Sequence, residues 1–174
     1  MTPRPVESTG VQPPGVVNPA DLHALAVALR IKDKVDAHVT IISMGPAQAH
    51  SALKECLARG ADRAILLADK AFAGADTWAT SHTPASAVKK LGHYDIVVCG
   101  EKTVDGDTGQ VGPEMAEWLG IPHVTYVREV TEVNGHLRAL CDMGDCTYVA
   151  DAHLPVFLGP PHTQSRSLHS CSFR

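Results

Sequence analysis

The residues with the clearest chemical potential stand in one loop, GEKTVDGDTGQV, which runs from Gly100 to Val111. The loop carries three carboxylates and one lysine. Two of the carboxylates, Glu101 and Asp105, are candidates for a general acid and a general base. No neighbouring pattern supplies a reacting partner or a cause for a raised pKa, so a solvated loop face is the stronger interpretation.

An apolar run precedes this loop and a helical pattern follows it. The run Ile96–Cys99 predicts a strand that is buried on both faces of a parallel sheet. Gly109, Gln110 and Gly112 then lead into a helix through Pro113, near the first-turn position where a missing N–H costs least. A strand, a glycine-rich loop and a helix N-terminus together favour the binding of an anion such as a phosphate.

The aspartates of the loop argue against a bare phosphate cup. Asp105 and Asp107 would repel a phosphate unless they turn outward, or unless they hold the turn by capping Thr108. We therefore expect the backbone amides to face the phosphates and the carboxylates to serve the turn. A plain strand-to-helix connection is the alternative, because a glycine-rich loop alone is weak evidence of nucleotide binding.

Other kinds of site have little support in the sequence. Serine, histidine and cysteine residues are scattered, and no P-loop lysine motif occurs, so we expect no enzyme activity and no catalytic residues. Cys141 and Cys146 have no second pair that would complete a zinc site, so no metal is expected. An odd number of irregularly spaced cysteines (five) suits a reducing, cytoplasmic location.

Composition narrows the choice of partners and of architecture. The 174 residues suit one domain, and a net charge of -4 gives no reason to expect nucleic acid as a partner. The first ten residues lack the apolar core of a signal peptide, and no apolar run is long enough to enter and cross a membrane. We expect a flexible arm at 1–17, an α/β domain at 18–158 and an unstructured tail at 159–174.

Periodicity predicts a succession of strands and helices. The first helix begins after Asn18, the predicted N-cap, with Pro19 at its first position. Further helices are expected at Ala47–Arg59, at Asp76–Leu91 with a restart or kink near Pro84, and at Glu114–Leu119. Strands are expected at His38–Met44, Arg63–Leu67, Ile96–Cys99, His123–Val130 and His136–Leu140, with short additions at Tyr148–Val149 and Pro155–Leu158.

This order predicts an α/β fold. Strands alternating with helices give a mostly parallel sheet with flanking helices, and the Asn134-Gly135 turn adds a C-terminal β-hairpin. Sites in such sheets gather at the carboxyl ends of the strands. We therefore expect Met44-Gly45, the Asp69–Asp76 loop and Gly100–Gln110 to converge on one crevice.

Longer motifs add a resemblance to a known family. The runs MGPAQAHSALKECLARGADRAILLADKAFAGADTWATS and YDIVVCGEKTVDGDTGQVGPEMAEWLGIPHVTYVREV strongly resemble the beta subunit of electron-transfer flavoprotein. GADRAILL, FAGADT, DGDTGQVGPE and LGIPHVTYV follow one another in the order of the family motifs, and the resemblance extends from about Thr9 to Leu158.

The resemblance implies a fold, partners and cofactors. The family fold is a Rossmann-like α/β domain of the adenine-nucleotide hydrolase-like type. A beta subunit pairs as a heterodimer with an alpha subunit that holds most of a redox-active FAD, and it binds an adenine nucleotide of its own, AMP or, in the electron-bifurcating form, a second FAD. The pair carries electrons between flavin dehydrogenases and a quinone oxidoreductase or a similar acceptor.

Carried over to this chain, the resemblance assigns nucleotide contacts to three segments. They are the Asn-Pro turn, the end of the second predicted element and the phosphate loop. The implied cofactor-binding residues are Asn18, Pro19, Ala20, Asp21, Met44, Gly45, Gly100, Glu101, Lys102, Thr103, Val104, Asp105, Gly106, Asp107, Thr108, Gly109, Gln110 and Val111. The DGDTGQVGPE form of the loop slightly favours FAD over AMP.

The chain also departs from the family pattern. An opening strand of the type ILVCIKQVPD is replaced by MTPRPVESTG, and the region that wraps the alpha subunit is not found after Leu158. We therefore expect a beta subunit that is truncated at both ends. The alternatives are a stand-alone adenine-nucleotide-binding module resembling universal stress proteins, and a fragment without function.

Overall fold

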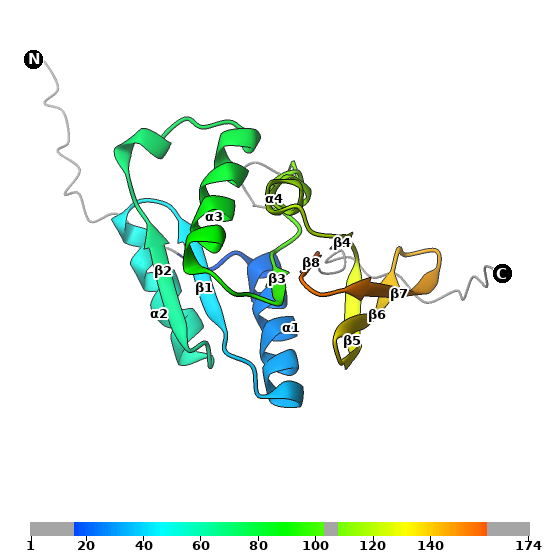
Figure 1. Ribbon diagram of the computed structural model, residues 1–174. Helices are drawn as coiled ribbons and strands as arrows, with labels where there is room; N and C mark the ends of the chain where they lie inside the picture. Colours follow the sequence, from blue (N-terminus) through cyan, green and yellow to red (C-terminus); the bar gives the residue numbers. More distant parts are fainter. Residues whose placement is uncertain (1–15, 103–107, 160–174) are drawn as a thin grey trace, which may run out of the picture.

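The computed structural model describes residues 16–102 and 108–159 (Figure 1). The predicted arm at 1–17 and tail at 159–174 lie almost wholly outside the described residues. Within them the helical elements are α1 (Pro19–Val35), η1 (Ala47–Ala49), α2 (His50–Ala58), η2 (Lys70–Phe72), α3 (Thr77–Leu91) and α4 (Val111–Leu119). The strands are β1 (Thr40–Met44), β2 (Arg63–Leu67), β3 (Ile96–Val98), β4 (His123–Val124), β5 (Val127–Val133), β6 (His136–Asp142), β7 (Thr147–His153) and β8 (Val156–Leu158).

The strand pairing confirms the predicted fold class. β1 and β2 pair in parallel, and β8 lies between β3 and β4, parallel to both. The antiparallel strands β5, β6 and β7 form a separate sheet beside β4 and β8 (Figure 1). The parallel strands thus form two hydrogen-bonded groups with helices packed against them, which is the α/β arrangement expected from alternating strands and helices.

The turn of the predicted hairpin is confirmed, but its first strand, β5, starts later than predicted and extends beyond Val130 to Val133. Asn134 donates its N–H to the carbonyl of His136 at 2.8 Å, and Gly135 has a φ of 68°. The predicted strand His123–Val130 is divided at Tyr126, whose φ is 57°. Its first part becomes β4 and joins the parallel group, while its second part becomes β5. A turn at a non-glycine residue is hard to recognise because such residues rarely adopt a positive φ.

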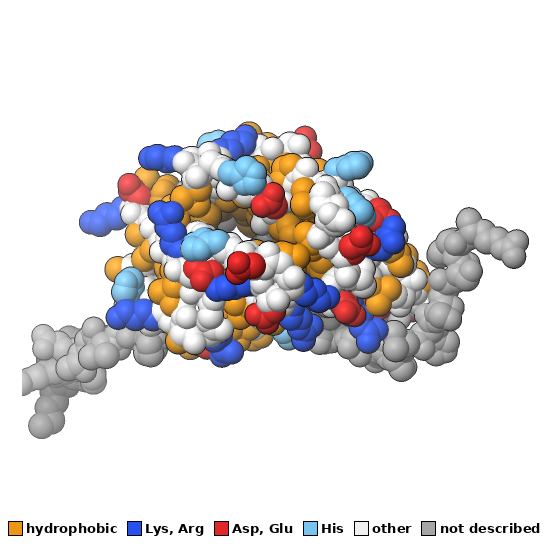
Figure 2. Space-filling model, turned by 60° about the horizontal axis from the view of Figure 1, so that its bottom comes forward, with side chains coloured by type: hydrophobic (Ala, Val, Ile, Leu, Met, Phe, Trp, Pro, Cys, Tyr) orange, Lys and Arg blue, Asp and Glu red, His pale blue; other side chains and the backbone are white. Residues whose placement is uncertain are grey.

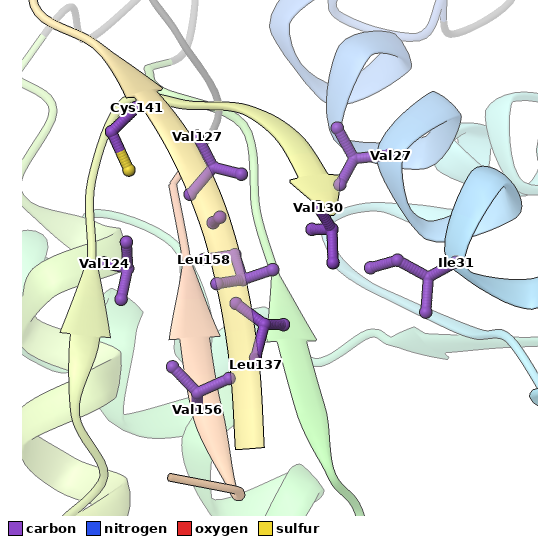
Figure 3. Close-up of a cluster of buried hydrophobic side chains, with 10 residues drawn as sticks. Val27, Ile31, Val124, Val127, Val130, Leu137, Cys141, Val156 and Leu158 are labelled. Atoms are coloured by element: carbon purple, nitrogen blue, oxygen red, sulfur yellow. The ribbon is translucent and has the colours of Figure 1, made fainter. Parts of the chain in front are cut away.

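The short strand β8 is the centre of the fold rather than an addition to it. Val156, Phe157 and Leu158 are all 0% exposed. Figure 3 shows Val156 and Leu158 facing Val127 and Leu137 of the hairpin. Three residues are too few to reveal periodicity, so the sequence could not show how central this strand is.

The strand before the loop is covered on both faces, as predicted, but its residues are only partly buried. Ile96 and Val98 pack against the cluster around β8 and the hairpin, and Val97 packs against the cluster that contains Met115 and Phe157. Ile96, Val97 and Val98 of β3 are only half-buried. β8 pairs with one edge of β3, and in the described part of the chain no strand pairs with the other edge. The apolar run was therefore a correct signal for a strand, but not for its degree of burial.

Helix α1 is wedged between two hydrophobic clusters. Val27 and Ile31 point toward the hairpin and β8 (Figure 3). On another side, Leu25 packs with Val39 and Cys56. Because α1 is covered on both sides, it holds the parallel strands and the hairpin together, and its N-terminal end is fixed in position.

Helix α3 continues through Pro84 without a restart, contrary to one of the two predictions for this proline. Pro84 supplies no N–H to the turn before it. Ala85, which follows it, is 1% exposed and packs in one cluster with Met115 and Ala116 of α4. Tertiary packing of α3 on α4 thus offsets the lost hydrogen bond.

Positively and negatively charged side chains are mixed on the face of the molecule shown in Figure 2. Lysine and arginine side chains alternate there with aspartate and glutamate side chains. Among the helices of residues 16–102 and 108–159, none combines the length and the apolar character needed to cross a membrane.

Candidate functional site

Two of the three predicted segments meet where α1 begins and β3 ends. The side-chain Nδ2 of Asn18 donates a 2.7 Å hydrogen bond to the carbonyl oxygen of Lys102. A Cβ placed on Gly100 would overlap Oδ1 of Asp21 and lie 3.0 Å from the carbonyl carbon of Ala20. Glycine is therefore required at position 100, because the backbone of α1 approaches it so closely.

The carboxyl group of Asp21 is the main electrostatic feature of this contact. Asp21 is exposed as a whole residue, yet protein atoms crowd its carboxyl group, and this desolvation raises its pKa above the usual value. Hydrogen bonds from the Asn18 side chain and the Gly100 backbone N–H act in the opposite direction, because they stabilise the ionised carboxylate. Asp21 thus serves as an acceptor at the entrance of the loop.

Asn18 occupies the predicted N-cap position, and Pro19 is the first residue of the helix, as expected. The Asn18 side chain makes no cap hydrogen bond to its own helix. It reaches across to Lys102 instead. The Asn-Pro pattern therefore predicted the position of Asn18 correctly. It could not predict the hydrogen-bond partner of Asn18, because Lys102 lies 84 residues away in the chain.

At its other end the loop leads into α4. Gly109 has a φ of 63°, a conformation that suits glycine, and Gln110 occupies the N-cap position without a side-chain cap. Val111 is the first residue of α4. The positive end of the helix dipole therefore lies beside Thr108 and Gly109, where a phosphate would be stabilised.

A close contact joins the end of β3 to the start of α4. A Cβ on Gly112 would lie 2.8 Å from Sγ of Cys99 and 3.4 Å from Cε1 of Phe157. Burial raises the pKa of the Cys99 thiol to about 12, and the nearby Asp21 carboxylate adds to the shift. Cys99 is thus a packing residue under the loop, not a nucleophile at ordinary pH.

The segment after η2 also reaches the loop. Thr77, the first residue of α3, donates to Oε1 of Glu114 at 3.1 Å and lies 3.4 Å from Oε1 of Gln110. Oε2 of Glu114 is buried and has no partner among the described residues. The Asp69–Asp76 loop therefore ends beside the start of α4, while the expected crevice of three converging loops stays a prediction.

In the described part of the chain, no hydrogen bond joins the third predicted segment, Met44-Gly45, to the glycine-rich loop. Met44 ends β1, and Gly45 donates its N–H to the carbonyl of Leu67 in β2 at 3.0 Å. The nearest atom to a Cβ on Gly45 is Cβ of Ala49 in η1. The central part of the loop, Thr103, Val104, Asp105, Gly106 and Asp107, lies outside the described residues, so the expected outward turn of its aspartates stays a prediction.

Sequence reasoning did not include Thr77, Cys99 and Glu114 in the site. Asp76 accepts from the N–H of Ala79 and caps α3, so the Asp-Thr pair was a readable sign of a helix start. It did not reveal that this start faces α4. For Cys99 and Glu114 no local signal exists, because their contacts depend on how β3, α3 and α4 pack.

The observed geometry suits the binding of an anion better than it suits acid–base chemistry. The starts of α1 and α4 meet at the end of β3, where the glycines at positions 100 and 112 let the protein's own elements pack closely, and Gly109 has an uncrowded Cβ position. Such an arrangement can bind phosphate groups through backbone N–H donors. Asn18, Asp21 and Gly100 would form one side of that site, and Thr108, Gly109 and Val111 the other.

A cavity lies elsewhere, between α1 and β5, with a volume of about 540 Å³. Val27, Ile31 and Val130 form its apolar part, and Arg30, Lys34 and Arg128 are among the charged residues around it. It contains none of the predicted nucleotide residues.

The sequence of this chain is similar to those of known proteins. The sequence profile of the electron transfer flavoprotein domain matches residues 11–159. The chain is 54% identical over 157 residues to the electron transfer flavoprotein subunit beta of Clostridium acetobutylicum, which covers 88% of this chain and 60% of that relative. It is 55% identical over 145 residues to the subunit of the same name from Thermoanaerobacterium thermosaccharolyticum, covering 83% and 55%.

A third relative is the caffeyl-CoA reductase-Etf complex subunit CarD of Acetobacterium woodii, which is 45% identical over 146 residues, covering 83% of this chain and 56% of the relative. The chain thus spans about three fifths of the length of the curated relatives it matches. The profile match includes the start of α1, the glycine-rich loop and the central strand β8. The chain therefore belongs to the electron transfer flavoprotein domain family.

Proposed function

We propose that this chain is a beta-type subunit of an electron-transfer flavoprotein that binds an adenine nucleotide between the starts of α1 and α4. The observation that carries the proposal is the contact of Asn18 and Asp21 with Lys102 and Gly100. It joins segments that the family resemblance assigns to the nucleotide. The relatives named as electron transfer flavoprotein beta subunits support the same function.

In this proposal the chain is an electron carrier subunit in the cytoplasm rather than an enzyme. It pairs with an alpha subunit that holds an FAD, and the pair accepts electrons from flavin dehydrogenases and passes them to a quinone oxidoreductase or a similar acceptor. The flavin supplies the redox chemistry when it is bound. The residues of this chain bind and orient the nucleotide through backbone amides and the Thr108 hydroxyl.

Two nucleotides are compatible with the loop. AMP needs a cradle for one phosphate, whereas FAD needs a diphosphate cradle and space beyond it for the isoalloxazine ring. Gly109 has the backbone freedom for a close approach to either. The DGDTGQVGPE form of the loop leads us to favour FAD slightly.

The test is to co-express the chain with an alpha-type partner, purify the complex, denature it and count the released nucleotides. Two flavins per heterodimer are expected if this loop binds FAD. One flavin and one AMP would exclude FAD in this loop and keep the subunit assignment. Failure to form a complex, with ATP bound to the single chain, would instead support a stand-alone nucleotide-binding module.

A further inference from the structure

The two edges of the antiparallel sheet differ in how open they are to a further strand. At one edge, β5 pairs with β6 through two register shifts, and the carbonyl of Val130 accepts a 2.7 Å hydrogen bond from Lys34 of α1. At the other edge, β7 pairs with β6 through seven residue pairs in unbroken register (Figure 1). Bulges and covering side chains are devices that block edge pairing. In the described part of the chain, no strand pairs with the outer edge of β7.

The sequence of β7, TYVADAH, lacks the residues that usually protect an edge strand. It contains no lysine and no proline, which commonly prevent pairing at such positions. Its one carboxylate, Asp151, accepts hydrogen bonds of 3.0 and 3.2 Å from Arg138, its register partner in β6. Val149, two residues away and so on the same face of the sheet, is 60% exposed. The strand therefore offers a regular edge with an exposed valine near its middle.

The inner face of β7 leaves apolar side chains incompletely covered. Tyr148, Ala150 and Ala152 pack against the cluster around β8 and the hairpin, but each is only partly buried. They belong to the last strand of the sheet. A strand added beyond β7 would therefore extend the sheet, satisfy backbone groups along the edge and cover these side chains further.

A second copy of β7 is a suitable added strand. Two-fold symmetry requires a strand that is complementary to itself, and directly opposed residues of an antiparallel pair lie on the same face. A two-fold axis at Asp151 would place two carboxylates opposite each other, and an axis at Ala150 would place Val149 opposite Asp151. An axis at Val149 pairs Val149 with itself, Thr147 with Asp151 and Tyr148 with Ala150, without a like-charge contact.

We propose that two copies of this chain associate through antiparallel pairing of their β7 strands, with the two-fold axis at Val149. The two three-stranded sheets then form one continuous sheet across the axis. The inference is independent of the nucleotide site, because β7 contains none of the residues assigned to that site.

Cysteine cross-linking in the full chain tests both the contact and its register. Val149→Cys would place two thiols opposite each other, with Cβ atoms about 4.5–5.5 Å apart, and should form a disulfide between the two copies of residue 149 under mild oxidation. Asp151→Cys is the matched control on the same face. Its two copies would lie four residues apart along the strands, about 13 Å, which is too far for a disulfide. Peptide mass spectrometry of the dimer identifies the linked residues and separates this disulfide from any that the native cysteines form.

Sedimentation equilibrium measures the strength of the association. Val149→Lys would place two like charges opposite each other and remove the valine pair, so the dimer dissociation constant is expected to rise about tenfold. Thr131→Lys adds the same charge to an exposed position of β5, the other edge strand, and should leave the constant unchanged. Thermal unfolding of both variants at low concentration shows whether each chain is folded.

Three results would overturn the proposal. A wild-type chain that stays monomeric over the dilution series would exclude the association. Equal cross-linking of Val149→Cys and Asp151→Cys would show random collision instead of the stated register. Association of wild-type strength in Val149→Lys would assign the contact to another edge, such as that of β1, because pairing there does not bring two copies of residue 149 together.

Discussion

The side chain of Asn18 and the backbone carbonyl of Lys102, 84 residues apart in the chain, are joined by a hydrogen bond of 2.7 Å. This bond connects the start of the first helix to the first residues of the glycine-rich loop. It explains why Asn18 does not cap its own helix, although it stands at the cap position. Tertiary contacts therefore shape the candidate site at the N-terminal end of the loop, and the backbone conformation of Gly109 shapes it at the C-terminal end.

At the exit of the loop, Gly109→Val is expected to weaken nucleotide binding more than Asp105→Asn. A Cβ at Gly109 would obstruct a phosphate, and valine is strained at a φ of 63°. Dissociation constants of the two variants in the complex with an alpha-type partner test this. Gly135→Val is the matched control, since its φ is 68° and the strain of about 1–3 kcal/mol should be similar. Greater damage from Asp105→Asn would show that the loop does not act through its backbone.

Contact between Cys99 and Gly112 predicts a specific coupling. Gly112→Ala would place its Cβ 2.8 Å from Sγ of Cys99, and we expect a loss of about 1–3 kcal/mol in the free energy of unfolding. Cys99→Ala removes the sulfur, so the double variant should recover part of this loss. Urea unfolding of both single variants and the double variant measures the interaction energy. Strictly additive effects would contradict the contact.

The raised pKa of Cys99 predicts low thiol reactivity. With a pKa of about 12 against an ordinary value of 9.0, the thiolate fraction near pH 8 should be about a thousandfold lower than for a free cysteine. Alkylation at pH 8, followed by mass spectrometry, should leave Cys99 unmodified in the folded chain. The chain unfolded in urea is the control, in which Cys99 should react. Rapid modification of the folded protein would contradict the burial of this thiol.

The same shift has a consequence for stability at high pH. Because the folded-state pKa lies above the unfolded-state value, the folded protein keeps a proton that the unfolded chain releases. The resulting stabilisation is complete below pH 9 and is lost as the pH rises toward 12. Thermal unfolding of the wild type should therefore lose more stability between pH 8 and pH 10 than that of Cys99→Ala. Parallel pH profiles would contradict the shift.

Strand β1 predicts self-association of the chain when it is studied without a partner. β1 pairs with β2 on one side, and no strand of the described part pairs with its other edge. Exposed edges of this kind template further pairing. Sedimentation velocity over a dilution series should therefore reveal reversible association. A clean monomer with a sharp, concentration-independent thermal transition would show that the edge is not available.

A matched pair of variants tests which edge is responsible. Ile42 in β1 and Ile65 in β2 are partners in the strand register and are both half-buried. A lysine in an edge strand discourages pairing. Ile42→Lys should therefore reduce association more than Ile65→Lys does. The reverse order would assign the association to β2.

Local patterns predicted much of this fold because they reflect local physics. The Asn-Pro start of α1, the strand Arg63–Leu67 and the Asn134-Gly135 turn depend on backbone preferences of neighbouring residues, and each is confirmed. The glycine-rich loop was likewise located between a strand and a helix, as the structure has it. The resemblance of consecutive motifs then identified the family, which no single loop could do.

Tertiary structure alone decided which of these elements meet. The three residues of β8 form a fully buried strand because β3 and β4 pair with it and the hairpin packs over it. A segment of three residues shows no periodicity from which this burial could be predicted. Asn18 and Asp21 reach Lys102 and Gly100 because the packing of α1 between two clusters brings its start against the end of β3. Long-range contacts of this kind depend on the packing of the whole domain, so the sequence determined the parts of the site and the fold determined their partners.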